Sequence, residues 1–198
     1  MAGFTTHTGT IAVYNADNVD TDRIIPARFL TMVTRSGYGQ LLFNDVRRQE
    51  SCFPLDRDEA EGASILVVGT NFGCGSSREH AVWAIQQAGF VVVIARTDPD
   101  SPGYSDIFRS NAANCGLLLV ELSAADHSKL VEAGSGATVT VDLVHQTVVS
   151  DGREMPFELN AAVREQLLAG LDLVGTTLVY EDKIASFERN WDAFAPKG

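Results

Sequence analysis

Residues 64–95 read SILVVGTNFGCGSSREHAVWAIQQAGFVVVIA, and this stretch decides the fold class. The apolar run Ser64–Val68 predicts a buried strand, and Gly69–Gly75 predicts a glycine-rich loop. Apolar residues at helical spacing predict a helix over Ser77–Ala88, and Phe90–Ala95 predicts a second buried strand. A strand, a helix and a strand in succession are typical of α/β proteins, so we expect an α/β fold.

The rest of the chain continues this alternation of strands and helices. Gly9–Tyr14 predicts a first strand, and a stretch rich in Asn and Asp over residues 15–22 predicts a turn. The pattern contains no internal repeat, low-complexity tract or linker, so we expect one domain over residues 1–198. Further helices are expected at Ala27–Val33, Leu41–Arg48, Ser105–Asn114, Ser123–Val131, Ala161–Ala169 and Asp182–Phe194, and further strands at Leu117–Glu121, Val139–Val144 and Thr147–Val149.

The charge balance is strongly acidic. The 198 residues include 26 acidic and 15 basic side chains, which gives a net charge of −11. A field of that sign repels phosphate backbones and anionic lipids, so we expect no nucleic acid and no membrane partner. Twelve of the basic residues are Arg, the side chain suited to bidentate carboxylate recognition. An anionic ligand would therefore need positive charge concentrated at one place.

Cysteine usage bears on metal binding and on compartment. Cys52, Cys74 and Cys115 form no C-x-x-C pair, so the sequence predicts no metal site and no cofactor held by this chain. Three cysteines without a pairing pattern indicate a reducing environment, and we expect a cytoplasmic protein. The first residues lack the pattern of a signal peptide, and no apolar run approaches the ~18 residues that span a bilayer.

The glycine-rich loop is the first candidate site. Gly73 and Gly75 allow the backbone to approach a ligand, and the start of the following helix supplies amides and a positive dipole end. This geometry suits an anion. The loop lacks the Gly-Lys-Ser/Thr of a P-loop, and it lacks the third glycine of a dinucleotide fingerprint.

The side chains after the loop allow two interpretations. Ser76 and Glu79 have the spacing of a capping box, which is a structural role. Arg78, in contrast, opposes the helix dipole by roughly 0.3–1 kcal/mol in the first turn, which favours a carboxylate beside it. We therefore take Ser76, Ser77 and Arg78 as candidate ligands of an anion. His80 next to them is more typical of a structural histidine than of a catalytic one.

A second candidate is the acidic turn Asp20-Thr21-Asp22. Paired carboxylates can share a proton or orient a histidine, but two Asp in a loop are also typical of a solvated Asx turn. Arg35 is by default a surface arginine. The sequence alone does not decide whether the acidic turn and Arg35 have a functional or a structural role.

Taken together, these motifs resemble the isopropylmalate dehydratase small-subunit family, which is related to the C-terminal swivelling domain of aconitase. The resemblance is carried by residues 18–26 (NVDTDRIIP), by residues 71–81 (NFGCGSSREHA) and by residues 106–108 (DIF). It implies a swivelling β/β/α fold that acts with a separate large subunit in a heterodimer. The partner would hold a [4Fe–4S] cluster and the substrate would be a small dicarboxylate.

The resemblance also implies roles for individual residues. Ser76 corresponds to the base that removes a proton next to a carboxylate, and Ser77 and Arg78 correspond to ligands of the substrate carboxylates. Asp22 corresponds to a residue that steadies catalytic histidines, and Arg35 falls one residue away from a further substrate arginine. The implied reaction interconverts 2-isopropylmalate and 3-isopropylmalate through 2-isopropylmaleate, in leucine biosynthesis.

Two segments depart from the family pattern, namely Arg96–Ser105 and Ser51–Leu55. We expect both departures to alter substrate choice or the docking face more than the chemistry. They leave open a related hydro-lyase for citramalate, a dimethylmalate or homoaconitate. A non-catalytic anion-binding domain is the remaining alternative.

Overall fold

A mixed β-sheet organises the chain. The computed structural model describes residues 3–31, 34–75, 78–189 and 191, and within them seven strands form one sheet in the order β4-β3-β2-β1-β5-β6-β7. β1 to β4 pair in parallel, whereas β5, β6 and β7 pair antiparallel. The strands are β1 Thr6–Tyr14, β2 Ile65–Val68, β3 Val92–Thr97, β4 Leu118–Ser123, β5 Thr138–Asp142, β6 Thr147–Ser150 and β7 Arg153–Pro156.

β1 joins the two halves of the sheet. Its second half, Ile11–Tyr14, pairs in parallel with β2, and its first half, Thr6–Thr10, pairs antiparallel with β5. The segments that follow β1 and β2 therefore leave the sheet at the same edge, because parallel strands end on the same side. This pairing brings residues 15–22 next to the glycine-rich loop.

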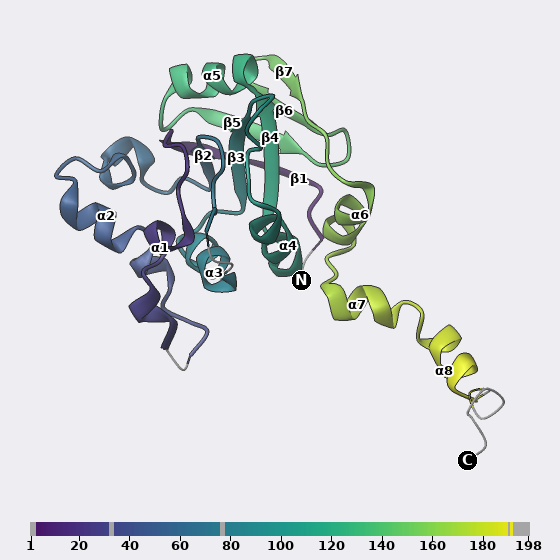
Figure 1. Ribbon diagram of the computed structural model, residues 1–198. Coiled ribbons are helices and arrows are strands. Elements are labelled where there is room, and N and C mark those ends of the chain that lie inside the picture. The colour runs from purple at the N-terminus through teal and green to yellow at the C-terminus, as the bar shows by residue number, and fades with distance from the viewer. Residues whose placement is uncertain (1–2, 32–33, 76–77, 190, 192–198) are drawn as a thin grey trace.

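Eight α-helices lie in the described ranges and are distributed around the sheet (Figure 1). Short 3-10 turns occupy Ala27–Thr31, Gly39–Leu41, Pro54–Asp56 and Asp58–Ala60. No helix in these ranges is long and apolar enough to cross a bilayer. The helices are α1 Thr21–Ile24, α2 Asn44–Gln49, α3 Glu79–Gln87, α4 Asp106–Cys115, α5 Ala124–Ala133, α6 Ala161–Ala169, α7 Leu173–Leu178 and α8 Glu181–Arg189.

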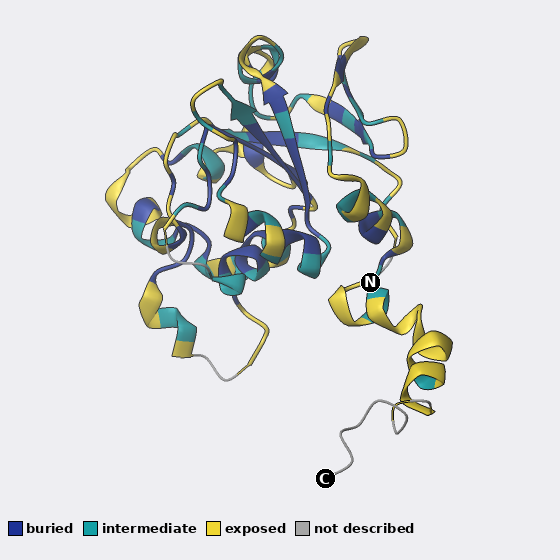
Figure 2. Cartoon of the chain, turned by 45° about the vertical axis from the view of Figure 1, so that its right-hand side comes forward, coloured by how far each residue is buried: buried dark blue, intermediate teal, exposed yellow. Residues whose placement is uncertain are grey.

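The parallel strands are buried on both faces, as Figure 2 shows by colour. Leu66 and Val68 of β2 join one apolar cluster, which also contains the inner faces of α3 and α4. Ile65 and Val67 join a second cluster with α5, α6 and the antiparallel strands. Alternating residues of one strand point to opposite faces, so β2 contributes to both cores.

Most of the predicted elements are confirmed within a few residues. The N-cap predicted at Ser123 is confirmed, since its hydroxyl accepts from the Asp126 amide at 3.2 Å. The regular helix predicted over Ala27–Val33 is wrong for Ala27–Thr31, which form a 3-10 turn, and residues 32–33 lie outside the described residues. The helix predicted over Leu41–Arg48 begins later, at Asn44, because Phe43 has a left-handed backbone. The sequence patterns missed α1, α7 and β7, which are only four to six residues long.

The last two helices, α7 and α8, project away from the rest of the structure. Figure 1 shows α7 and α8 extending away from the sheet as an arm, and most of their residues are exposed in Figure 2. We call the described residues 173–189 and 191 the C-terminal arm. The helix predicted over Asp182–Phe194 corresponds to α8, which begins at Glu181 and is described to Arg189.

Candidate functional site

The glycine-rich loop lies alongside the turn that follows β1. Asn18 N–H donates to the Thr70 carbonyl at 2.9 Å, and Gly73 N–H donates to the Val19 carbonyl at 2.8 Å. Thr21 N–H donates in turn to the Cys74 carbonyl at 3.0 Å. The two segments, about 50 residues apart in sequence, thus form one continuous backbone pairing.

The segment before α4 borders the other side of this loop. Asn71 N–H donates to the Pro102 carbonyl and Phe72 N–H to the Gly103 carbonyl, both at 2.8 Å. The Ser105 hydroxyl donates to the Gly73 carbonyl at 2.7 Å. Residues 96–105, which depart from the family pattern, therefore include part of the scaffold of the loop.

Gly73 and Gly75 both adopt positive φ, at 73° and 85°. A Cβ at Gly73 would lie 2.3 Å from Cγ of Phe108, so the position also requires a glycine for space. The prediction that the amides of this loop face a ligand is wrong for Gly73, whose N–H is bonded to Val19 within the fold. The structure thus assigns Gly73 a structural role.

Asp22 and Arg78 meet at the start of α3. Arg78 Nη1 donates to Asp22 Oδ1, and this carboxylate oxygen also accepts from the Ala27 amide at 3.2 Å. The Arg78 side chain is only 16% exposed, whereas that of Asp22 is 55% exposed. The hydrogen bond from Arg78 holds the pKa of Asp22 below its ordinary value, so Asp22 is ionised at neutral pH.

The helix start differs from the predicted capping box. α3 begins at Glu79 with Arg78 in the N-cap position, so Glu79 is not the third helical residue. The Glu79 carboxylate instead accepts from the Cys115 thiol at 3.3 Å and joins α3 to α4. Burial raises the pKa of Cys115 to about 12, so this thiol stays protonated. Ser76 and Ser77, the other two predicted anion ligands, lie outside the described residues.

The predictions for the acidic turn are resolved residue by residue. Asp20 caps α1, since its carboxylate accepts from the Arg23 amide at 2.7 Å, which is the structural role expected of an Asx turn. Asp22, two residues later, points to Arg78 instead. The acidic turn therefore contains one structural and one candidate functional carboxylate.

Arg35 lies against the outer side of α3. Its guanidinium carbon is 5.0 Å from the ring centre of Trp83, and its carbonyl accepts from the Gln87 side chain at 2.7 Å. The same Gln87 amide group accepts from Tyr38 N–H at 2.9 Å, so one side chain holds both ends of this segment. No ion pair joins Arg35 to a carboxylate among the described residues.

His80 belongs to an aromatic cluster beside Arg35. Its ring centre is 4.6 Å from that of Trp83 and 5.4 Å from that of Tyr38. Tyr38 is fully buried, so these contacts anchor α3 on the core. The structural role that the sequence favoured for His80 is consistent with this packing.

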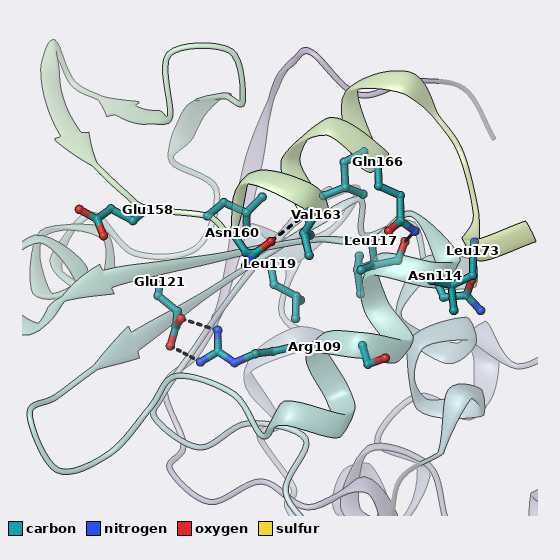
Figure 3. A pocket seen from close by; sticks show the side chains of 14 residues that line it. Arg109, Asn114, Leu117, Leu119, Glu121, Glu158, Asn160, Val163, Gln166 and Leu173 are labelled. Atoms are coloured by element: carbon teal, nitrogen blue, oxygen red, sulfur yellow. Dashed lines mark hydrogen bonds and ion pairs between the residues drawn. The ribbon is translucent and has the colours of Figure 1, made fainter. Parts of the chain in front are cut away.

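A separate cavity of about 670 Å³ opens between β4, α4 and α6 (Figure 3). Arg109 and Glu121 form a bidentate ion pair at one end, with nitrogen–oxygen distances of 2.5 and 2.8 Å. Leucines make up much of the remaining wall, and the lining includes none of the candidate site residues described above. Sequence reasoning missed this ion pair because both residues are ordinary charged positions in their own elements.

Comparison with known proteins identifies the family. The Aconitase C-terminal domain family matches residues 1–125, and the LeuD_N family matches residues 129–161. A 3-isopropylmalate dehydratase small subunit from Halalkalibacterium halodurans is 46% identical over 196 residues, covering 95% of this chain and 98% of the relative. The chain belongs to the 3-isopropylmalate dehydratase small-subunit family. The small subunit from Corynebacterium diphtheriae is 44% identical and covers 99% and 98% of the two chains.

The fold agrees with this assignment. The crystal structure of 3-isopropylmalate dehydratase (leuD) from Methanocaldococcus jannaschii matches with a TM-score of 0.65 and 29% identity, over 92% of this chain and 99% of that one. The α/β fold and its likeness to the C-terminal domain of aconitase are thereby confirmed. Membership in a family of small subunits implies a large-subunit partner.

The described residues offer no metal centre. In ranges 3–31, 34–75 and 78–189, no group of three or more His, Cys, Asp or Glu side chains is placed to hold a metal ion. Cys52, Cys74 and Cys115 are all free thiols.

Proposed function

We propose that this chain is the small subunit of a hydro-lyase that interconverts 2-isopropylmalate and 3-isopropylmalate through 2-isopropylmaleate. The observation that carries the proposal is the meeting of Asp22 and Arg78 at the start of α3, in a chain related to such subunits over nearly its full length. The small subunit would act only together with its large subunit. Its product would serve leucine biosynthesis.

Arg78 is the proposed ligand of a substrate carboxylate. An arginine that is 16% exposed keeps its guanidinium in a fixed direction, and Asp22 holds one of its nitrogens. The remaining N–H groups can donate to a carboxylate of the substrate. Ser77 and Arg35 are proposed as further carboxylate ligands. Ser77 follows the family motif, and Arg35 lies one residue from the family's position and packs against Trp83 of α3.

Ser76 is the proposed base that takes the carbon-bound proton. A serine hydroxyl is a very weak acid, so its alkoxide needs positive groups close by. Ser76 precedes the start of α3 in the sequence, where the amides of the first helical turn and the Arg78 guanidinium would supply such groups. We propose that Asp22 fixes the direction of Arg78 and thereby acts on both substrate and base.

The proposed cofactor is a [4Fe–4S] cluster in the large subunit, which would act as a Lewis acid on the departing hydroxyl. Free thiols at all three cysteines fit a reducing compartment, so we propose that the enzyme works in the cytoplasm.

The test is anaerobic reconstitution of the chain with its large subunit, followed by turnover assays on a panel of 2-hydroxy acids. We expect 2- and 3-isopropylmalate to react, and Ser76→Ala to lower kcat by about 10³-fold or more while the two subunits still assemble. Ser128→Ala on α5, far along the chain from the loop, is the matched control and should keep full activity.

Three outcomes would contradict the proposal in different ways. Turnover of a methylmalate or of homoaconitate with inert isopropylmalate would show a related hydro-lyase. Wild-type activity of Ser76→Ala would remove this residue from the mechanism. Complex formation without turnover of any acid would show a non-catalytic anion-binding subunit.

A further inference from the structure

The C-terminal arm exposes an unusual amount of apolar surface. Of the eleven large hydrophobic residues that are exposed in the described chain, eight lie in the arm. An exposed apolar patch of this kind marks an interaction site when it is contiguous. The eight residues are Leu173, Val174, Leu178, Val179, Tyr180, Ile184, Phe187 and Trp191.

Four of these residues lie on α8 or next to its ends. Ile184 and Phe187 belong to the helix, Tyr180 directly precedes it, and the Trp191 ring centre is 5.3 Å from that of Phe187. Tyr180, Ile184, Phe187 and Trp191 follow one another at intervals of four, three and four residues. Residues at such intervals form a single stripe, which is the pattern by which an amphipathic helix enters a groove. Tyr and Trp are also the side chains that most often dominate binding energy at interfaces.

The root of the arm is fixed to the body of the protein. Leu173 N–H donates to the Asn114 side chain at the end of α4, at 3.2 Å. Asp172 caps α7 by accepting from the Gly175 amide at 2.6 Å. Leu173 also lines the cavity between α4, β4 and α6 (Figure 3), so this residue joins the cavity to the apolar surface of the arm.

This surface is continuous with the layer that carries the candidate site. Arg78 stands at the start of α3, α3 packs against α4, and Asn114 of α4 holds the arm. The family implies a large-subunit partner, and a partner that covers Arg78 and α3 would lie close to α4 and to the root of the arm.

Charge argues against a second copy as the occupant. Each copy carries a net charge of −11, to which the arm contributes Glu181, Asp182 and Glu188 against Lys183 and Arg189. The cavity wall contributes Glu121 and Glu158 against Arg109. Two copies joined through arm and cavity would therefore bring like charges together.

We infer that the C-terminal arm and the adjoining cavity form the docking surface for the large subunit, which receives the apolar face of α8 in a groove with a basic rim. This inference rests on the proposed function, because that function supplies the partner. The arm contributes affinity and takes no part in the chemistry.

The experiment titrates the large subunit against the full-length chain and its variants Ile184→Asp and Phe187→Asp. Both residues are exposed, so the variants should fold, and thermal unfolding checks this. Val144→Asp, at an exposed apolar position in the turn after β5, is the matched control. We expect each arm variant to weaken binding about tenfold or more and the control to leave it unchanged.

The readouts separate this inference from the proposed function. An excess of large subunit should restore turnover to the arm variants, because they lack affinity only, but should not restore it to Ser76→Ala. Unchanged affinity in both arm variants would overturn the inference. The chain alone could also form a dimer that Phe187→Asp dissociates, while the affinity for the large subunit is unchanged. That result would overturn the inference and show that a second copy of the chain occupies the arm. If the large subunit binds in an arm-dependent way but the complex turns over no substrate, the proposed function is overturned and the docking role of the arm still holds.

Discussion

The pairing of Asp22 with Arg78 changes how the charge of the candidate site is understood. Arg78 by itself would offer a full positive charge to an anion. In this structure Asp22 already neutralises part of that charge, and a substrate carboxylate must share the guanidinium with it. Asp22 thereby fixes the direction of Arg78 at the expense of its net attraction for anions.

Asp22→Asn is the substitution that tests this pairing. The amide keeps the shape of the side chain but removes the charge-assisted bond, which is worth roughly 1.5–3 kcal/mol. We expect kcat/KM of the reconstituted enzyme to fall about tenfold or more. The free energy of unfolding should change by about 1 kcal/mol or less, because Asp22 is largely exposed.

Asp56→Asn provides the control for this prediction. Asp56 makes a similar exposed ion pair with Arg47, at 2.5 Å, between α2 and a 3-10 turn. Loss of this ion pair should leave kcat/KM unchanged in the same steady-state assay. Equal activity losses in the two variants would mean that the effect of Asp22 is not specific to the site.

At the scale of single elements, the glycine-rich loop is held from both sides by backbone pairing. The turn after β1 borders one side, and residues 102–105 border the other. Glu121 adds to the second side by accepting from the Gly103 amide at 2.6 Å while it pairs with Arg109. The loop is therefore part of the scaffold that sets the direction of α3.

Gly73→Ala and Gly62→Ala test the geometry of this loop as a matched pair. Both glycines have nearly the same φ, at 73° and 70°, so both variants carry a similar backbone strain of roughly 1–2 kcal/mol. A Cβ at Gly62 meets nothing within 4 Å, whereas a Cβ at Gly73 overlaps the Phe108 ring. We expect Gly73→Ala to be less stable than Gly62→Ala by about 1–3 kcal/mol in urea unfolding.

The two glycine variants should differ more in turnover than in stability. A shift of the loop away from Phe108 also moves the start of α3 and Arg78, so Gly73→Ala should lose turnover and Gly62→Ala should retain it. Equal stabilities would show that Phe108 moves aside without cost, which would contradict the close packing of this element.

At the scale of the whole molecule, pH should act on stability in two stages. Burial lowers the pKa of His127, whose Nε2–H donates to the Val68 carbonyl at 2.7 Å, and burial also lowers the pKa of His7. As the pH falls below about 6.5, the unfolded chain therefore binds more protons at these histidines than the folded chain does. The free energy of unfolding should begin to fall in this range.

The second stage involves carboxylates that are paired in the folded state. Arg28 lowers the pKa of Asp45 to about 2, and bonds from Lys129 and His145 lower the pKa values of Asp126 and Asp142. Their contribution is present above about pH 4 and is lost as the pH falls through the lowered values. Urea midpoints between pH 7 and pH 2 measure both stages. His127→Gln should weaken the first stage and leave the second, and an unchanged first stage would contradict the assignment.

Sequence patterns recovered the elements whose cause is local. The parallel strands were predictable from continuous apolar runs, since both of their faces are buried. The glycine-rich loop was predictable from residues that tolerate positive φ, and the start of α5 from the hydroxyl of Ser123. The motifs around Asp22 and Arg78 also marked the candidate site. Each of these signals is contained in a short stretch of chain.

Only the tertiary structure decided which of these residues meet. Asp22 contacts Arg78 across 56 positions because β1 and β2 pair in parallel and end at the same edge. The tertiary structure also binds the amide of Gly73 within the fold, joins Glu79 of α3 to Cys115 of α4, and leaves the apolar residues of α8 exposed. Periodicity and spacing describe neighbours along a chain, whereas contacts between distant segments depend on strand order and register, which local patterns do not encode.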